Sequence, residues 1–187
     1  MNIQTKSDNV KEQIRKATKD DIGHIVDIYD EIHDAEEQGK MHIGWQRGIY
    51  PTRDTAENAL QRGDLFVCEI DGEVCASAII NHEQLDSYAE VEWGIEADKT
   101  EVMVLHTLTV SPSRGKKGIG HKFVMFYEEY ARQSHCRVLR IDTQAQNVVA
   151  RKMYPKMGFR EVGIINCPFQ GIQSIQLVLL EKAVQEA

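Results

Sequence analysis

Apolar residues recur along this chain with two different spacings, and each spacing predicts one kind of element. A spacing of three and four residues predicts helices after Thr18 and after Pro51-Thr52, and further helices over 119–130 and 147–157. Short runs of apolar and β-branched residues predict strands at 14–17, 65–70, 73–80, 104–110, 138–143, 159–164 and 172–180. The resulting order, with strands and helices interleaved, is typical of a single mixed α/β domain.

Local signals indicate where several of these elements begin and end. Thr18 can cap the first helix, with Asp21 at the third helical position. Asp71-Gly72, between two strand-like runs, predicts a two-residue hairpin turn. We expect a flexible N-terminal segment at 1–12, one domain over 13–182 and a C-terminal tail at 183–187.

Composition narrows the classes of function. The chain has 187 residues, of which 42% are hydrophobic, enough for a sizeable core. Its net charge of -7 argues against a general nucleic-acid partner. No apolar run is long enough to span a bilayer, and the first residues lack a signal-peptide core, so we expect no membrane partner. Cys68, Cys75, Cys136 and Cys167 lack zinc-site spacing, which favours no metal and free thiols in a reducing cytoplasm.

A glycine-rich turn over 113–120 joins a predicted strand to a predicted helix. Its backbone N–H groups and the positive helix end favour an anion such as a phosphate. A P-loop would need a lysine and a hydroxyl residue where His121 and Lys122 stand. A dinucleotide fingerprint would need a third glycine after Gly118 and Gly120, and it is missing. A turn without any ligand is the remaining alternative.

A second motif, Asn147-x-x-Ala150-x-x-x-Tyr154-x-x-x-Gly158-Phe159, follows the next predicted strand. With the glycine-rich turn, it resembles the GNAT superfamily of acetyl-CoA-dependent N-acetyltransferases, whose signatures are [QR]xxGx[GA] and NxxAxxxYxxxGF. The segments 48–52, 106–108 and 139–143 resemble a bacterial branch of unassigned substrate. The resemblance implies an α/β (α+β) fold with a mixed, mostly antiparallel sheet, splayed between strands 4 and 5 and flanked by helices on both faces.

By this resemblance, acetyl-CoA (CoA) binds along the splayed fourth strand and the glycine-rich turn. Gly115 stands where the family has Gln or Arg, so backbone N–H groups should hold the pyrophosphate, with Arg114, Lys116 and Lys117 as nearby charge. Asn147 either caps its helix alone or also contacts the pantetheine arm. The implied donor-binding residues are Leu108, Thr109, Val110, Gly115, Lys116, Lys117, Gly118, Ile119, Gly120, Asn147 and Ala150.

The resemblance implies Tyr154 as the general acid for the departing thiolate. A phenol has a reference pKa of about 10, so it is protonated at neutral pH. The alternative is a tyrosine that packs in the core, and Pro155 after it predicts a kinked or tightened helix. The attacking amine must lose a proton, and Asp142 or His106 is expected to receive it. The alternative for each of these two residues is a structural role, His106 as a hydrogen-bonded core histidine and Asp142 as a partner of Arg140 or of a backbone group.

For the acceptor, the resemblance implies a pocket lined by Trp45, Arg47 and Tyr50. The acidic connection over 82–101 either attracts a cationic amine or is a solvated loop. The predicted reaction is transfer of acetyl to a primary amine of a small molecule or peptide by direct attack, in a cytoplasmic monomer or homodimer. The alternatives are a non-catalytic acyl-CoA-binding or regulatory domain on the same fold, and a nucleotide-binding protein.

Overall fold

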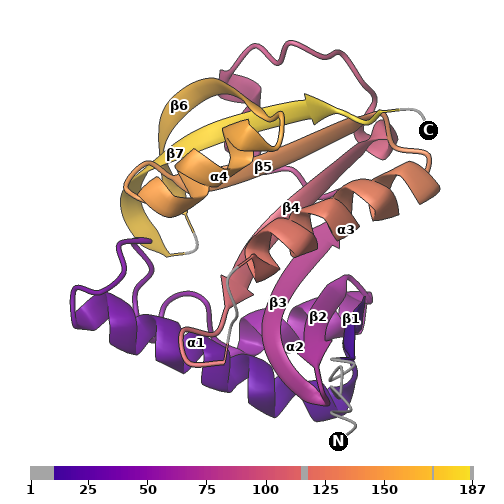
Figure 1. The fold of residues 1–187 in the computed structure, drawn as a ribbon. Coiled ribbons are helices and arrows are strands. Elements are labelled where there is room, and N and C mark those ends of the chain that lie inside the picture. Colours follow the sequence, from indigo (N-terminus) through magenta and orange to yellow (C-terminus); the bar gives the residue numbers. More distant parts are fainter. Residues whose placement is uncertain (1–10, 115–117, 170, 186–187) are drawn as a thin grey trace, which may run out of the picture.

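The computed structural model describes residues 11–114, 118–169 and 171–185, and its elements follow the predicted order (Figure 1). The strands are β1 (Glu12–Lys16), β2 (Leu65–Ile70), β3 (Glu73–Asn81), β4 (Val102–Val110), β5 (Val138–Gln144), β6 (Arg160–Phe169) and β7 (Ile172–Ala183). The α-helices are α1 (Ile22–Glu37), α2 (Arg53–Arg62), α3 (Ile119–Gln133) and α4 (Val148–Lys156). Since β1 begins at Glu12 and β7 ends at Ala183, the folded unit extends one residue beyond each predicted boundary of the domain.

The strands form one sheet in the order β1-β2-β3-β4-β5-β7-β6. Every neighbouring pair in it is antiparallel except β4 and β5, which run parallel. This is the mixed, mostly antiparallel sheet that the sequence predicted. α3 is the crossover that the parallel β4–β5 pair requires, because parallel neighbours cannot be joined by a tight turn.

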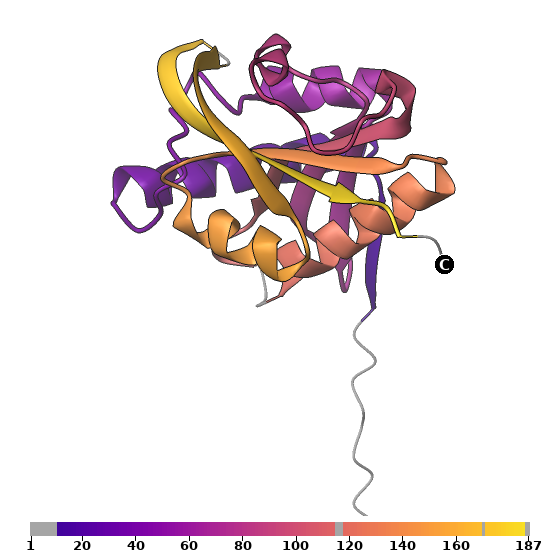
Figure 2. The same ribbon diagram turned by 90° about the horizontal axis from the view of Figure 1, so that it is seen from above.

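Helices lie on both faces of the sheet (Figure 2). Alternate residues of β2 show why, since side chains along a strand point to opposite faces. Leu65 and Val67 pack with α1 and α2, whereas Phe66 and Cys68 pack with α3. The prediction of helices on both faces is therefore confirmed.

The half of the sheet formed by β5, β6 and β7 has α4 on one face and, among the described residues, no α-helix on the other. That second face is covered by the connection over 82–101 (Figure 2). Apolar side chains of the connection pack there against strand residues such as Val104 and Leu179. The residues that the connection contributes to this cluster are Leu85, Tyr88, Val91, Trp93, Ile95 and Ala97.

The predicted hairpin turn is confirmed by its backbone. Asp71 has φ 52° and Gly72 has φ 86°, the left-handed conformation that two-residue hairpin turns require. Just beyond the turn, Cys75 is the extra residue of a β-bulge, since Cys68 pairs with Ala76 and Glu69 with Val74. The Cys75 thiol donates to the Cys68 carbonyl oxygen at 3.3 Å, and both thiols are free and buried.

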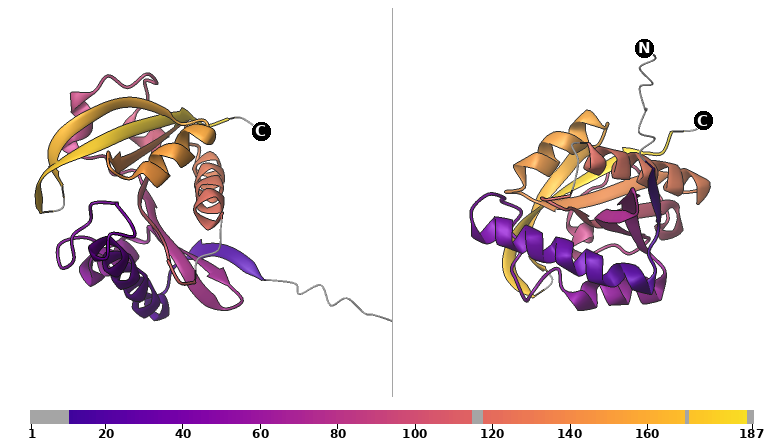
Figure 3. Two further views of the ribbon diagram at one scale, coloured as in Figure 1. Left: turned by 60° about the vertical axis from the view of Figure 1, so that its left-hand side comes forward. Right: turned by 60° about the horizontal axis from the view of Figure 1, so that its bottom comes forward.

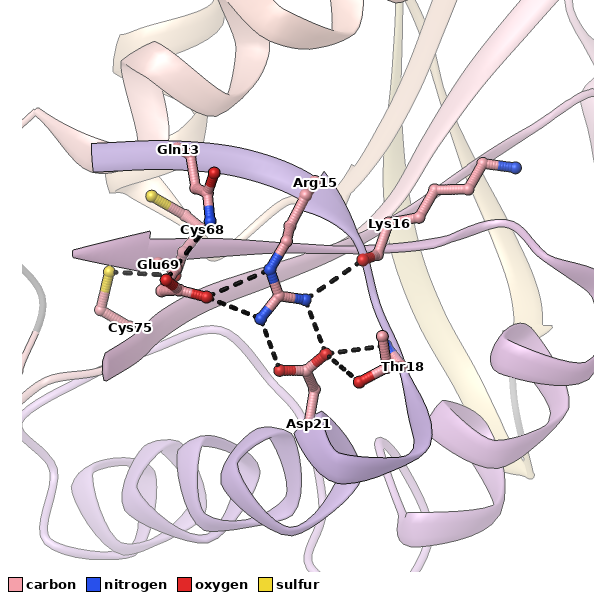
Figure 4. A network of polar contacts seen from close by, with 8 residues as sticks. All are labelled: Gln13, Arg15, Lys16, Thr18, Asp21, Cys68, Glu69 and Cys75. Carbon is pink, nitrogen blue, oxygen red and sulfur yellow. Dashed lines mark hydrogen bonds and ion pairs between the residues drawn. The ribbon is translucent and has the colours of Figure 1, made fainter. Parts of the chain in front are cut away.

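The entry into α1 is held by an ion-pair network between β1, β2 and the helix (Figure 4). Arg15 donates to Asp21 at 2.7 Å and to Glu69 at 2.7 Å, and Thr18 and Asp21 form the predicted capping box. The hydrogen bonds from Arg15 lower the pKa of Asp21 to about 2. This network anchors the start of the helix that lies below the candidate site.

Candidate active site

The sheet opens between β4 and β5. Their parallel pairing runs from Val102 with Val138 to Leu105 with Ile141 and stops there. Beyond this point β5 pairs with β7 alone and β4 with β3 alone, so the two halves of the sheet diverge (Figure 3). His106 and Asp142 are the first residues past the junction on the two strands.

A β-bulge distorts β4 at this opening. Because His106 pairs with Ile79 and Thr109 with Ser77, the two residues Thr107 and Leu108 both stand opposite Ala78. Thr107 has φ 49°, a conformation that is strained for a β-branched residue. Its hydroxyl is hydrogen-bonded to the hydroxyl of Tyr50. The bulge leaves part of the β4 backbone without a partner in the ladder, at the mouth of the opening.

On one side of the opening lies a groove of about 490 Å³, here called the donor groove. Its walls are the end of β4, the start of α3, the start of α4 and the loop over 40–43. Gly118 precedes α3 with φ 96°, which explains a glycine at this position. All of the predicted donor-binding residues that the structure describes line this groove: Leu108, Thr109, Val110, Gly118, Ile119, Gly120, Asn147 and Ala150. Gly115, Lys116 and Lys117 lie outside the described residues.

The donor groove fits acetyl-CoA in its chemistry. Backbone of the bulged strand faces the groove and suits the amides of a pantetheine arm, while the N-terminus of α3 suits its phosphates. Asn147 accepts a hydrogen bond from the Ala150 N–H at 3.2 Å, so the predicted helix cap is confirmed. Arg114 is paired with Glu31 of α1 at 3.1 Å, and Glu31 also accepts from Ser111 at 2.6 Å.

On the other side of the opening lies a polar groove of about 660 Å³, here called the acceptor groove. One wall is a face of α2 with polar residues every four positions, Asp54, Asn58 and Arg62. The opposite wall is the segment over 81–85 together with Lys99. This wall of α2 was not among the predicted site residues, although the four-residue spacing of its polar side chains is present in the sequence.

A chamber of about 70 Å³ lies between the two grooves at the junction of β4 and β5 and shares lining residues with both. It shares Leu108, Asn147 and Tyr154 with the donor groove. It shares further residues with the acceptor groove, namely Tyr50, His106, Thr107 and Phe169. Asp142 also borders it, so the three predicted catalytic side chains surround one small space.

Tyr154 is 5% exposed and lies in the last turns of α4. α4 continues through Pro155, and the Tyr154 carbonyl accepts from the N–H groups of Met157 and Phe159 at 2.9 and 3.1 Å. Burial, and then the charge of Asp142, raise the pKa of Tyr154 above its ordinary value. The phenol is therefore a protonated donor throughout the physiological range.

Asp142 and His106 differ in their surroundings. Desolvation raises the pKa of the Asp142 carboxyl, and the nearby His106 and a hydrogen bond from Tyr88 partly offset the rise. His106 Nε2 lies 3.1 Å from Asn81 Oδ1 and 3.1 Å from the Glu83 carbonyl oxygen. Because both partners accept, Nε2 carries a proton, and Nδ1 is the ring nitrogen on which a further proton can be placed.

The structure brings two of the three predicted acceptor residues to the chamber. Trp45 and Tyr50 line it, with their rings edge to face at 5.9 Å. Arg47 does not line the chamber or either groove, and its predicted role in the acceptor pocket stays a prediction. Its guanidinium forms ion pairs with three carboxylates of α1, among them Glu37 at 2.8 Å and Asp30 at 3.2 Å. These carboxylates neutralise its charge at a place away from the opening.

Comparison with known proteins agrees with this geometry. A model of the acetyltransferase (GNAT) family matches residues 25–159. The uncharacterized N-acetyltransferase MJ1207 of Methanocaldococcus jannaschii is 24% identical over 158 residues, which cover 81% of this chain; the chain spans 62% of that relative's length. The chain belongs to the GNAT acetyltransferase family.

Solved structures share the fold. An N-acetyltransferase from Staphylococcus aureus Mu50 superposes with a TM-score of 0.66 at 20% identity, covering 94% of this chain and 99% of that one. The protein yncA of Salmonella typhimurium, assigned as an acetyltransferase and solved with its cofactor acetyl-CoA, gives 0.64 at 19% identity, covering 94% and 95%. These findings confirm the predicted fold and family, and with the family the class of enzyme, an acetyltransferase.

The described residues hold neither a membrane-spanning helix nor a cluster of metal ligands. Each helix there is too short or too polar to cross a bilayer. Within the same residues, no group of three or more His, Cys, Asp or Glu side chains is arranged to hold a metal ion.

Proposed function

We propose that this chain transfers an acetyl group from acetyl-CoA to a primary amine of a small molecule or peptide by direct attack, with Tyr154 as the general acid. The observation that carries the proposal is the chamber at the β4–β5 junction. It lies between an apolar groove and a polar one, and Tyr154, Asp142 and His106 all border it. Such an arrangement suits two substrates that enter from opposite sides and react where they meet.

Each residue at the chamber has a role that its surroundings support. Bound acetyl-CoA supplies an acetyl group activated as a thioester. The donor groove orients it, and Tyr154 Oη gives its proton to the departing sulfur. Asp142 or His106 Nδ1 receives the proton that the attacking amine loses. Trp45, Tyr50 and Phe169, whose rings pack edge to face, exclude water from the chamber.

The test is a turnover screen with acetyl-CoA over amines, amino acids, polyamines, aminoglycosides and peptides, followed by Tyr154→Phe. This change should lower kcat about 100-fold or more, because it removes the proton donor. CoA affinity, measured by calorimetry, should not change. The matched control is Tyr130→Phe on α3, whose ring packs on Phe66 away from the chamber and which should keep full activity.

The same variants decide between this proposal and its rivals. Tight CoA binding with no turnover on any amine would support a non-catalytic acyl-CoA-binding domain. An unchanged kcat in Tyr154→Phe would remove this residue from the role of acid. A nucleotide-binding protein would gain thermal stability from ATP with magnesium and none from CoA.

A further inference from the structure

The connection over 82–101 brings one side chain to Asp142 at the edge of the chamber. Tyr88 is 2% exposed, and its hydroxyl donates to Asp142 Oδ2 at 2.6 Å. Burial, and then the charge of Asp142, raise the pKa of Tyr88 well above its ordinary value. The Tyr88 hydroxyl is therefore a permanent donor to this carboxyl and takes no part in titration itself.

Trp93 and Arg140 hold the connection in place around Tyr88. The Trp93 ring lies 5.4 Å from the Tyr88 ring, and its Nε1 donates to the Tyr88 carbonyl oxygen at 3.0 Å. The Arg140 guanidinium stacks on Trp93 at 3.8 Å from the ring centre and also donates to Gln84. Because Arg140 precedes Asp142 by two residues on β5, their side chains share one face of the sheet.

Glu181 holds the connection at a second point. It is 2% exposed and pairs with Arg140 in the β5–β7 register. Its carboxylate accepts from the N–H groups of Gly94 and Ile95 at 2.8 and 3.3 Å, and from Arg160 at 2.6 Å. Two buried charged residues of neighbouring strands thus anchor a segment that has no long helix or strand of its own.

We propose that Tyr88 is a positioning residue for acetyl transfer, which acts by holding the Asp142 carboxylate in one orientation and favouring its charged form. The inference rests on the proposed function. Of the two candidate bases, Asp142 and His106, it selects Asp142 as the group whose protonation state governs loss of the amine proton. The anchors at Arg140 and Glu181 keep Tyr88 in place. The connection over 82–101 therefore serves the reaction through the buried face that carries Tyr88. Its acidic side chains lie on the opposite, exposed face.

Titratable or charged groups from several elements lie around Asp142. Tyr88 belongs to the connection and His106 to β4, and the remaining neighbours are Arg140 on β5, Tyr154 on α4, Cys167 on β6 and Tyr50 before α2. Among them, His106 and Tyr88 are the two that favour the charged carboxylate.

The test is Tyr88→Phe, which removes one hydroxyl and keeps the ring against Trp93. The carboxyl titration of Asp142, followed by NMR with ¹³C-labelled aspartate in the free protein, should move about one pH unit upward. The acid limb of kcat/KM should move with it, and kcat at neutral pH should fall about tenfold. KM for acetyl-CoA should stay within about twofold of the wild type.

Tyr127→Phe is the matched control, because it also removes a buried tyrosine hydroxyl that donates to backbone oxygens of Met103 and Arg140. Tyr127→Phe should lower the free energy of unfolding. It should leave the NMR titration of Asp142 and the pH profile of kcat/KM unchanged. Should Tyr88→Phe fold poorly, Trp93→Phe removes the Nε1 donor and should give a smaller shift in the same direction.

The NMR and kinetic readouts separate two kinds of failure. An unmoved Asp142 titration in both variants overturns the proposal, whatever the activity. A moved titration with an unmoved acid limb and unchanged kcat also overturns it, since Asp142 then does not govern proton loss. Absence of acetyl transfer by the wild type would instead refute the proposed function, and the titration would still test the contact.

Discussion

The two grooves that meet at the chamber are built in different ways. The donor groove is formed largely by residues between Leu108 and Tyr154, in two motifs with fixed spacing. The acceptor groove takes its walls from α2, the end of β3, the 82–101 connection, β4 and β6, which are distant in the sequence. Local motifs therefore suffice to form the donor groove, whereas the acceptor groove depends on how the whole chain folds.

The grooves also differ in charge. The donor groove is walled mainly by backbone and apolar side chains such as Val148, Val149 and Met153. The acceptor groove carries acids and bases on its rim, among them Asp54 and Lys99. Substitutions on the two sides should therefore separate the two Michaelis constants, and substitutions in the chamber should change kcat.

The largest effect is expected from Asp142→Asn, at the meeting point of the grooves. Loss of the group that receives the amine proton should lower kcat about 100-fold or more. In the wild type, activity should rise as pH rises through the raised pKa of Asp142, since the ionised carboxylate is the active form. A pH profile of kcat/KM for both proteins measures this, and the exposed Asp20→Asn is the control.

Asp142→Asn should also change stability in a predictable direction. The folded pKa of Asp142 lies above its unfolded value of about 3.9, so the folded state binds the extra proton. This contribution to stability is present below the unfolded pKa and is lost as pH rises through the folded pKa. The variant should therefore gain stability over the wild type across that interval, by about 1 kcal/mol, as urea unfolding at several pH values would show.

A smaller effect is expected on the donor side from Gly118→Ala. Among the residues that the structure describes, an added Cβ would meet nothing within 4 Å, so the expected cost is that of φ 96°. A conformational cost of about 1 kcal/mol should raise KM for acetyl-CoA about fivefold and leave the acceptor KM unchanged. Gly72→Ala, at φ 86° and equally free of neighbours, is the control for strain away from the groove. Equal effects of the two changes on KM would contradict the assignment of the donor groove.

The smallest effect is expected on the acceptor side from Asn58→Ala. Loss of one exposed amide should raise the acceptor KM about fivefold or less and leave KM for acetyl-CoA unchanged. Gln61→Ala on the same helix removes an amide that does not line the groove. Steady-state kinetics with both substrates varied would measure the contrast, and an equal response of the two variants would remove α2 from the acceptor site.

The difference between the grooves also explains what could be predicted from the sequence. Element order, the hairpin at Asp71-Gly72 and the cap at Asn147 depend on local spacing, and the structure confirms them. Topology then brings every described residue that was predicted to bind the donor to one groove. Local spacing was sufficient there because neighbouring residues of one strand and two helix starts form the walls.

The acceptor side depends on contacts that spacing cannot reveal. Arg47 turned to α1 because three carboxylates lie on that helix face, which only the fold brings near it. The buried face of the connection over 82–101 is indicated by the sequence, because apolar residues stand at every second position there, namely Val91, Trp93, Ile95 and Ala97. Its anchors, Arg140 and Glu181, become neighbours only through the β5–β7 register.

The size of the chamber has a consequence for side reactions. Its volume of about 70 Å³ is small beside the grooves of about 490 and 660 Å³ on either side. A ligand in each groove would cover the residues that the chamber shares with that groove. Wasteful hydrolysis of the thioester would then be limited by the dimensions of the reaction space as well as by the rings that border it.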